Sequence, residues 1–294
     1  MKKNVRNILS IVGIITISSI FVFKTEIINQ FSKPILNPLV PKNIDFAGEK
    51  TPLHIADVYE RMDREIITNT NFHTSTTLII KRANKVFPII EPILKEYNIP
   101  DDFKYLAVAE SALINAVSSA GARGVWQFMP QTGKEKGLEI NDFVDERYHL
   151  EKSTIAACKY LQEAKDKYGN WTLAAASYNA GLHGISKQLD GQNADNYYDL
   201  LLNEETSRYV FRILALKQIM ENQSMYGYHI KDKYSKIESK TIEVNYSIDN
   251  LATFAKENNI NYKILKIHNP WLRDKSLPNK TGKTYYLEIP TEGY

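Results

Sequence analysis

The sequence predicts a mainly α-helical protein with a small module of mixed α and β structure at its C-terminal end. Between residues 99 and 222, apolar side chains recur at helical spacing, and almost no segment alternates in polarity as a strand does. After Ser235 the pattern changes, because Thr241–Tyr246 alternates like a strand, helical segments follow, and a second strand-like run lies at 285–290. We therefore expect a helical domain followed by a β-α-α-β unit.

The first thirty residues differ from the rest of the chain. A basic stretch at 1–6 precedes an uncharged run at 8–23. This run is slightly long for the core of a signal peptide and slightly short for a membrane span of about 20 residues, so a cleaved signal and an uncleaved anchor both fit. In either case the basic start stays in the cytoplasm and the following chain is exported. Residues 1–30 are therefore predicted to be an N-terminal signal or membrane anchor.

The segment 31–94 is predicted to hold a tether and accessory helices. Prolines and asparagines up to about Lys50 favour a tether.

Glycines and a proline mark helix boundaries along the whole chain. Helices are expected at 55–68, at 74–97 with a break near Pro88 or Pro92, at 100–115, at 153–168 ending before Gly169, at 171–180 ending before Gly181, at 204–222 and at 248–258, with a helical or mixed segment at 264–268.

One carboxylate lies on the apolar face of a predicted helix. At about 100° per residue, Glu110 falls on the stripe of Phe103, Leu106 and Leu113. Burial disfavours the charged form, so the pKa of such a carboxyl is raised and the group stays protonated near neutral pH, as a general acid requires. A structural glutamate with an arginine or backbone partner in the core fits the same position. The helix pattern alone leaves both roles open.

Composition argues against several other classes of protein. The net charge of +3 is too small to indicate nucleic-acid binding. The single cysteine, Cys158, lies in a helical pattern and is expected to be a core residue, because that is the usual place of a lone cysteine in a helix. The six histidines are scattered without the spacing of metal ligands. We expect no nucleic-acid partner, no metal and no cofactor.

Four short motifs follow one another in an order that resembles a known enzyme family. They are Glu110-Ser111, the stretch SAGARGVWQFMP at 119–130, SYNAG at 177–181 and ETSRYV at 205–210. Together they resemble the lytic transglycosylases of the goose-lysozyme-like superfamily, most closely the membrane-bound D subtype. The resemblance implies a lysozyme-like α-helical catalytic domain at 95–230 that cleaves peptidoglycan.

The C-terminal unit resembles a LysM module and is expected over residues 238–294. Ser247–Asp249 replaces the usual glycine-aspartate turn, and the stretch 270–272 is bulky for such a module. A saccharide-binding module and a degenerate packing module therefore both stay open. The matching positions are Val244, Leu251, the turn from Ala255 to Ile260, Leu265, Asn269, Leu277 and Ile289-Pro290.

The resemblance implies a mechanism for Glu110. Most glycosidases use two carboxylates, and the sequence places none opposite Glu110. In the family's reaction one glutamate protonates the glycosidic oxygen and then takes the proton of the C6 hydroxyl of N-acetylmuramic acid, which leaves a 1,6-anhydro product. By resemblance Ser119, Gln127 and Met129 line the groove, Tyr178 and Asn179 address the N-acetyl sugar beside the scissile bond, and Tyr209 orients the glutamate or the sugar; Met129 fits packing as well as contact.

The expected partners follow from this resemblance. They are peptidoglycan glycan strands, a membrane through the N-terminal segment, and other cell-wall enzymes. The expected place is the cell envelope, on the periplasmic side. Two alternatives stay open: a muramidase that uses water, and a catalytically inactive scaffold that binds the cell wall.

Overall fold

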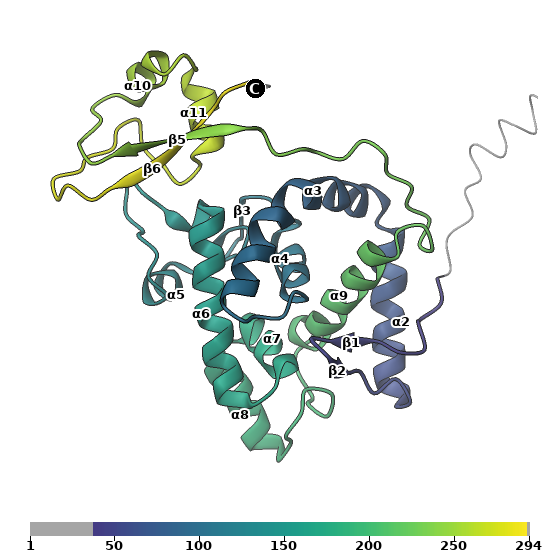
Figure 1. The fold of residues 1–294 in the computed structure, drawn as a ribbon. Helices are drawn as coiled ribbons and strands as arrows, with labels where there is room; N and C mark the ends of the chain where they lie inside the picture. Colours follow the sequence, from purple (N-terminus) through teal and green to yellow (C-terminus); the bar gives the residue numbers. More distant parts are fainter. Residues whose placement is uncertain (1–37, 293–294) are drawn as a thin grey trace, which may run out of the picture. The chain divides into compact units, whose positions relative to one another are not determined.

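The computed structural model describes residues 38–292 of the chain (Figure 1). The predicted signal or anchor at 1–30 lies outside this range. Within residues 38–292, none of the helices has both the length and the apolar content needed to cross a membrane. The elements up to residue 221 are β1 (Asp45–Phe46), β2 (Glu49–Lys50), α2 (Ala56–Asn71), α3 (His73–Glu96), α4 (Phe103–Ser111), β3 (Ala116–Val117), β4 (Arg123–Gly124), α5 (Pro130–Glu135), the 3-10 turn η1 (Glu146–Tyr148), α6 (Leu150–Tyr168), α7 (Trp171–Ala180), α8 (Leu182–Gln192) and α9 (Glu204–Glu221).

Helix α9 lies at the centre of the helical part. It packs against α2, α4 and α7, while α6 packs against α3 and α7 (Figure 1). Phe211 and Leu214 of α9 are fully buried, as are Phe103 and Leu106 of α4. Burying such apolar side chains is the main force that holds these helices together.

The second part of the fold is a two-stranded sheet with two short helices. Its elements are β5 (Ser239–Val244), α10 (Leu251–Glu257), α11 (Tyr262–His268) and β6 (Tyr285–Pro290). The strands are antiparallel, from the pair Ser239 and Pro290 to the pair Val244 and Tyr285. The predicted fold class, mainly helical with a small β-α-α-β unit at the C-terminal end, is confirmed.

Local capping explains why α6 and α7 end and begin where the sequence predicts. Gly169 follows α6 with a φ of +74°, a left-handed conformation that glycine adopts easily. Asn170 then accepts a hydrogen bond from the Leu173 amide at 2.8 Å, which caps α7. The break expected near Pro88 or Pro92 is absent, since α3 runs through both prolines. The buried face of α3 continues on both sides of them, from Ile80 to Leu94, and its packing offsets the missing backbone donors.

Part of the expected tether is built into the core. The β1–β2 hairpin buries Phe46 completely, with its ring 5.0 Å from that of Phe103. The carboxylate of Asp102 accepts the Ala47 amide at 2.6 Å and the Lys217 ammonium at 2.8 Å. The carboxylate of Glu49 accepts two amides at the start of α7. These contacts join residues far apart in sequence, so local composition did not reveal them.

The β-α-α-β unit is joined to a loop of the helical part by main-chain hydrogen bonds. The Asp145 amide donates to the Trp271 carbonyl at 2.9 Å, and the Arg273 amide donates to the Phe143 carbonyl at 2.7 Å. Val144 packs into the hydrophobic core of the unit. We refer to residues 139–149 as the junction loop.

A buried ion pair fixes the junction loop to a second loop. Arg147 binds the carboxylate of Asp145 twice, with Nε at 2.9 Å and Nη2 at 2.7 Å. Its Nη1 donates to the carbonyl oxygens of Gly121 and Phe128, each at 3.1 Å. We refer to residues 116–128, which include β3 and β4, as the groove loop. A single guanidinium therefore sets the spacing of the two loops.

We predict that Gly124→Ala unfolds more easily than Gly121→Ala. Both glycines have positive φ, +85° and +88°, but a Cβ on Gly124 would lie 1.9 Å from the Arg147 carbonyl oxygen, whereas a Cβ on Gly121 meets no atom within 4 Å. We expect losses of about 3 and about 1 kcal/mol, respectively. Urea unfolding of both variants measures the difference, and equal losses would show that the loops do not press on each other at Gly124.

Candidate active site

Glu110 lies at the C-terminal end of α4, where the chain turns sharply. Ala112 and Leu113 both adopt left-handed φ values, +53° and +59°, which cost about 1 kcal/mol each for such residues. Ser111 fixes the turn, because its hydroxyl donates to the Val125 carbonyl at 2.8 Å. Arg82 of α3 donates to the Ala112 carbonyl at 3.2 Å. Backbone strain held in place by such contacts is typical of functional sites.

The Glu110 carboxyl is held by a neutral donor. The hydroxyl of Tyr209, on α9, donates a hydrogen bond to Oε1 of Glu110. Loss of hydration raises the pKa of Glu110 from 4.5 to about 7, and the Tyr209 hydrogen bond lowers it in part. Both the protonated and the ionised form are therefore populated near neutral pH. This is the condition under which one carboxyl can act first as an acid and then as a base.

Two charged residues that the sequence analysis gave no role also act on Glu110. Glu205 and Arg212 share one face of α9 with Tyr209, and Arg212 lies 3.5 Å from the Glu205 carboxylate. The negative charge of Glu205 raises the pKa of Glu110, and the positive charge of Arg212 lowers it. Their helical spacing from Tyr209 was the available signal. These residues act on Glu110 because α9 packs against α4, and this packing could not be read from the sequence.

The predicted tyrosine and asparagine of SYNAG lie in the same region. The Tyr178 hydroxyl donates to the Trp126 carbonyl at 2.8 Å, and burial, followed by the charge of Glu110, raises its pKa. Asn179 accepts a hydrogen bond from the Thr206 hydroxyl at 2.9 Å. Tyr178 therefore ties α7 to the groove loop, and Asn179 ties α7 to the start of α9.

The remaining predicted residues lie on or beside the groove loop. Gln127, with a φ of +50°, donates through Nε2 to the carbonyls of Ala116 and Gly124, at 3.1 and 2.7 Å. This arrangement shapes the loop itself. Ser119 and Met129 are exposed. The structure thus brings Tyr209 and Tyr178 to Glu110, while a sugar-binding role for Ser119, Gln127, Met129 and Asn179 stays a prediction.

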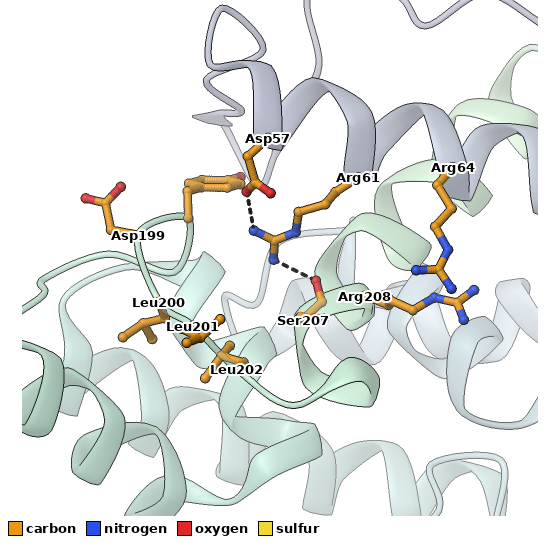
Figure 2. Close-up of a pocket in the computed structure, with 10 residues that line it drawn as sticks. Asp57, Arg61, Arg64, Asp199, Leu200, Leu201, Leu202, Ser207 and Arg208 are labelled. Atoms are coloured by element: carbon orange, nitrogen blue, oxygen red, sulfur yellow. Dashed lines mark hydrogen bonds and ion pairs between the residues drawn. The ribbon is translucent and has the colours of Figure 1, made fainter.

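A cavity of about 400 Å³ lies on another side of α9 (Figure 2). Arg61 of α2 crosses it, and donates to the Asp57 carboxylate at 3.1 Å and to the Ser207 carbonyl at 2.8 Å. Ser207 and Arg208 line the cavity from a different face of α9 than Tyr209. Neither Glu110 nor Tyr209 lines this cavity. Within residues 38–292, no group of three or more His, Cys, Asp or Glu side chains is arranged to hold a metal ion.

Two regions of the chain match models of known protein families. Residues 87–201 match the family model of the transglycosylase SLT domain, and residues 240–293 match that of the soluble lytic transglycosylase C-terminal LysM-like domain. The membrane-bound lytic murein transglycosylase D of Escherichia coli K12 is 30% identical over 190 residues, which cover 62% of this chain and 41% of the relative. The protein of the same name from Escherichia coli O6:H1 strain CFT073 matches with the same values. The predicted resemblance is confirmed, and the chain spans less than half the length of these relatives.

We predict that Glu110→Gln makes the protein more stable at alkaline pH. Below pH 4.5 the wild-type carboxyl is protonated in the folded and the unfolded state, so it adds no cost. Because its folded pKa is raised to about 7, stability falls as pH rises between these values. Above pH 7 the ionised carboxyl lowers the free energy of unfolding by about 3 kcal/mol. The amide of the variant does not ionise and avoids this loss.

Urea unfolding at pH 4.5 and pH 8 tests this prediction. Glu60→Gln, at an exposed position on α2, is the matched control and should show no gain that depends on pH. A stability difference for Glu110→Gln that is the same at both pH values would contradict the raised pKa.

Proposed function

We propose that the chain is a peptidoglycan lytic transglycosylase, which cleaves the β-1,4 bond between N-acetylmuramic acid and N-acetylglucosamine without water. The observation that carries this proposal is Glu110, whose pKa is raised to about 7 and whose carboxyl accepts the Tyr209 hydroxyl. The similarity of residues 87–201 to the SLT domain supports the same chemistry.

Glu110 acts as acid and base in turn. The protonated carboxyl donates its proton to the glycosidic oxygen, and the bond from C1 to that oxygen breaks. The N-acetyl carbonyl of the substrate stabilises the positive charge at C1. The Glu110 carboxylate then takes the proton of the C6 hydroxyl, whose oxygen bonds to C1. The carboxyl is protonated again, and the product carries a 1,6-anhydro ring.

The neighbouring residues serve this cycle in named ways. Tyr209 holds the Glu110 carboxyl by a hydrogen bond that is strongest when the carboxyl is ionised. Ser119, Gln127, Met129, Tyr178 and Asn179 bind the glycan, directly or by shaping the groove loop.

The proposal extends to the organisation of the chain. A signal or anchor at 1–30 exports the chain to the cell envelope, where peptidoglycan and other cell-wall enzymes are its partners. The segment 31–94, with its accessory helices and a β1–β2 hairpin that packs on the core, leads to a catalytic domain at 95–230 and to a LysM-like module at 238–294. The names of the relatives support an envelope location.

A muramidase that uses water is the second candidate, and one observation favours it. Glu205 is a second carboxylate whose charge acts on Glu110, and hydrolysis needs such a group to activate water. Glu205 is exposed, however, and it pairs with Arg212 at 3.5 Å. This arrangement suits a charge that adjusts Glu110 better than it suits a general base.

We predict that digestion of purified sacculi releases fragments with 1,6-anhydro ends. Because the C6 hydroxyl replaces water as the nucleophile, each product end is lighter by one water than a reducing end. Mass spectrometry of the soluble fragments measures this difference. Products that carry reducing ends alone would overturn the transglycosylase and favour the muramidase.

We predict that Glu110→Gln lowers the rate of cleavage by about 10²- to 10⁴-fold, the usual contribution of a general acid and base. Binding to glycan should persist, because the amide has nearly the shape of the acid. An inactive wild type that still binds sacculi would favour the scaffold alternative.

Glu205→Gln provides the matched comparison on α9. We expect this variant to keep most of the activity. As pH rises, its rate should begin to fall at a lower pH than the wild-type rate does, because removal of a negative charge lowers the pKa of Glu110. Turnover as low as that of Glu110→Gln would instead make Glu205 the base of a hydrolase.

A further inference from the structure

A second cavity, of about 450 Å³, lies between the helical part and the C-terminal module. On one side it is lined by Leu113, Asn115 and Val125, and on the other by Trp271 and Tyr286. We refer to it as the junction cavity. Its volume is in the range of small-molecule sites in proteins.

Two residues that line the junction cavity follow Glu110 closely in the chain. Leu113 and Asn115 follow Glu110 within a few residues and lie on the turn that ends α4. The carbonyl of Val125 accepts the Ser111 hydroxyl at 2.8 Å. A substrate held at Glu110 therefore has a neighbouring space into which a side branch can extend.

The walls of the junction cavity are fixed to each other. Residue Trp271 stacks on His149 of the junction loop, with ring centroids 5.9 Å apart, and on Tyr285 of β6, at 5.7 Å. On the far side of the loop, Tyr285 donates to the Glu139 carboxylate at 3.0 Å, and Arg273 lies 4.2 Å over the Tyr148 ring. Together with the main-chain bonds to Trp271 and Phe143, these contacts hold the module against the helical part.

The lining carries charges of both signs. Within residues 38–292, no ion pair occupies Lys85, Lys236, Glu151 or Glu288. Lys85 comes from α3, Glu151 from α6 and Glu288 from β6, so the charges face the cavity from separate elements. His149 stays neutral, because burial lowers its pKa to about 4. Exposed apolar surface adds to the lining at Tyr286.

We propose that the junction cavity binds the peptide branch of a peptidoglycan strand while Glu110 acts on the glycan. This inference rests on the proposed function. A peptide with free carboxylates, a free amine and aliphatic side chains is complementary to two lysines, two glutamates and an apolar rim. A neutral sugar can offer hydroxyl groups to these four side chains but no opposite charge. The C-terminal module is then a wall of the substrate site as well as a cell-wall contact.

Direct binding to the full chain tests the proposal. The probe is a synthetic tetrapeptide with two free carboxylates, one free side-chain amine and alanine residues, and calorimetry gives its Kd. We expect the wild type to bind it and the double variant Lys85→Ala/Lys236→Ala to bind at least tenfold more weakly. Lys240→Ala, an exposed lysine of β5 outside the cavity, is the matched control and should bind as the wild type does.

Two results would overturn the proposal. One is absence of tetrapeptide binding to the wild type, or equal binding by the double variant. The other is displacement of the tetrapeptide by a peptide-free tetramer of N-acetylglucosamine, which would make the junction cavity a sugar site.

Kinetics separate this proposal from the proposed function. We expect the double variant to raise the KM for glycan that carries peptides about tenfold more than the KM for the same glycan after removal of its peptides; equal changes would count against a peptide site. If the wild type cleaves neither glycan, the proposed function fails, while calorimetry still decides the binding site.

Discussion

The buried pair of Asp145 and Arg147 is the interaction on which the arrangement of both loops depends. Burying two charges costs several kcal/mol per ion, and that cost is offset only when the geometry of the pair is good and further hydrogen bonds satisfy the remaining polar atoms. Here the Arg147 guanidinium binds the Asp145 carboxylate and two carbonyl oxygens of the groove loop. The Asp145 amide donates a hydrogen bond to the C-terminal module. The groove loop, the junction loop and the module thus share one electrostatic centre, although they come from distant parts of the chain.

Three buried or partly buried carboxylates differ in the hydrogen-bond donors that they contact. Asp145 and Glu65 have arginine partners, the latter through Arg208 at 2.6 Å, and each holds elements together. Glu110 has a tyrosine instead. A neutral donor offsets part of the desolvation but not all of it, so the proton affinity stays high. Glu110 therefore differs from these two carboxylates in the charge of its hydrogen-bond donor.

The sequence revealed elements whose signals are local and missed those that depend on distant contacts. Gly169 and Asn170 mark the boundary of α6 and α7, and strand 285–290 shows its alternation directly. The β1–β2 hairpin is too short to show a pattern, and it is held by Asp102 and Lys217. In the site, the position of Glu110 on an apolar face was visible. The role of Glu205 and Arg212 was not, because it requires knowing which face of α9 meets α4.

The pairing of residues 143–145 with residues 271–273 affects the order in which parts of the protein can fold during synthesis. A ribosome synthesises the junction loop long before the partner segment of the module. Until that segment emerges, Val144 and the Asp145 amide lack these partners. A chain still under synthesis therefore carries the junction loop without the contacts that join it to the module, and these contacts are among the last to form.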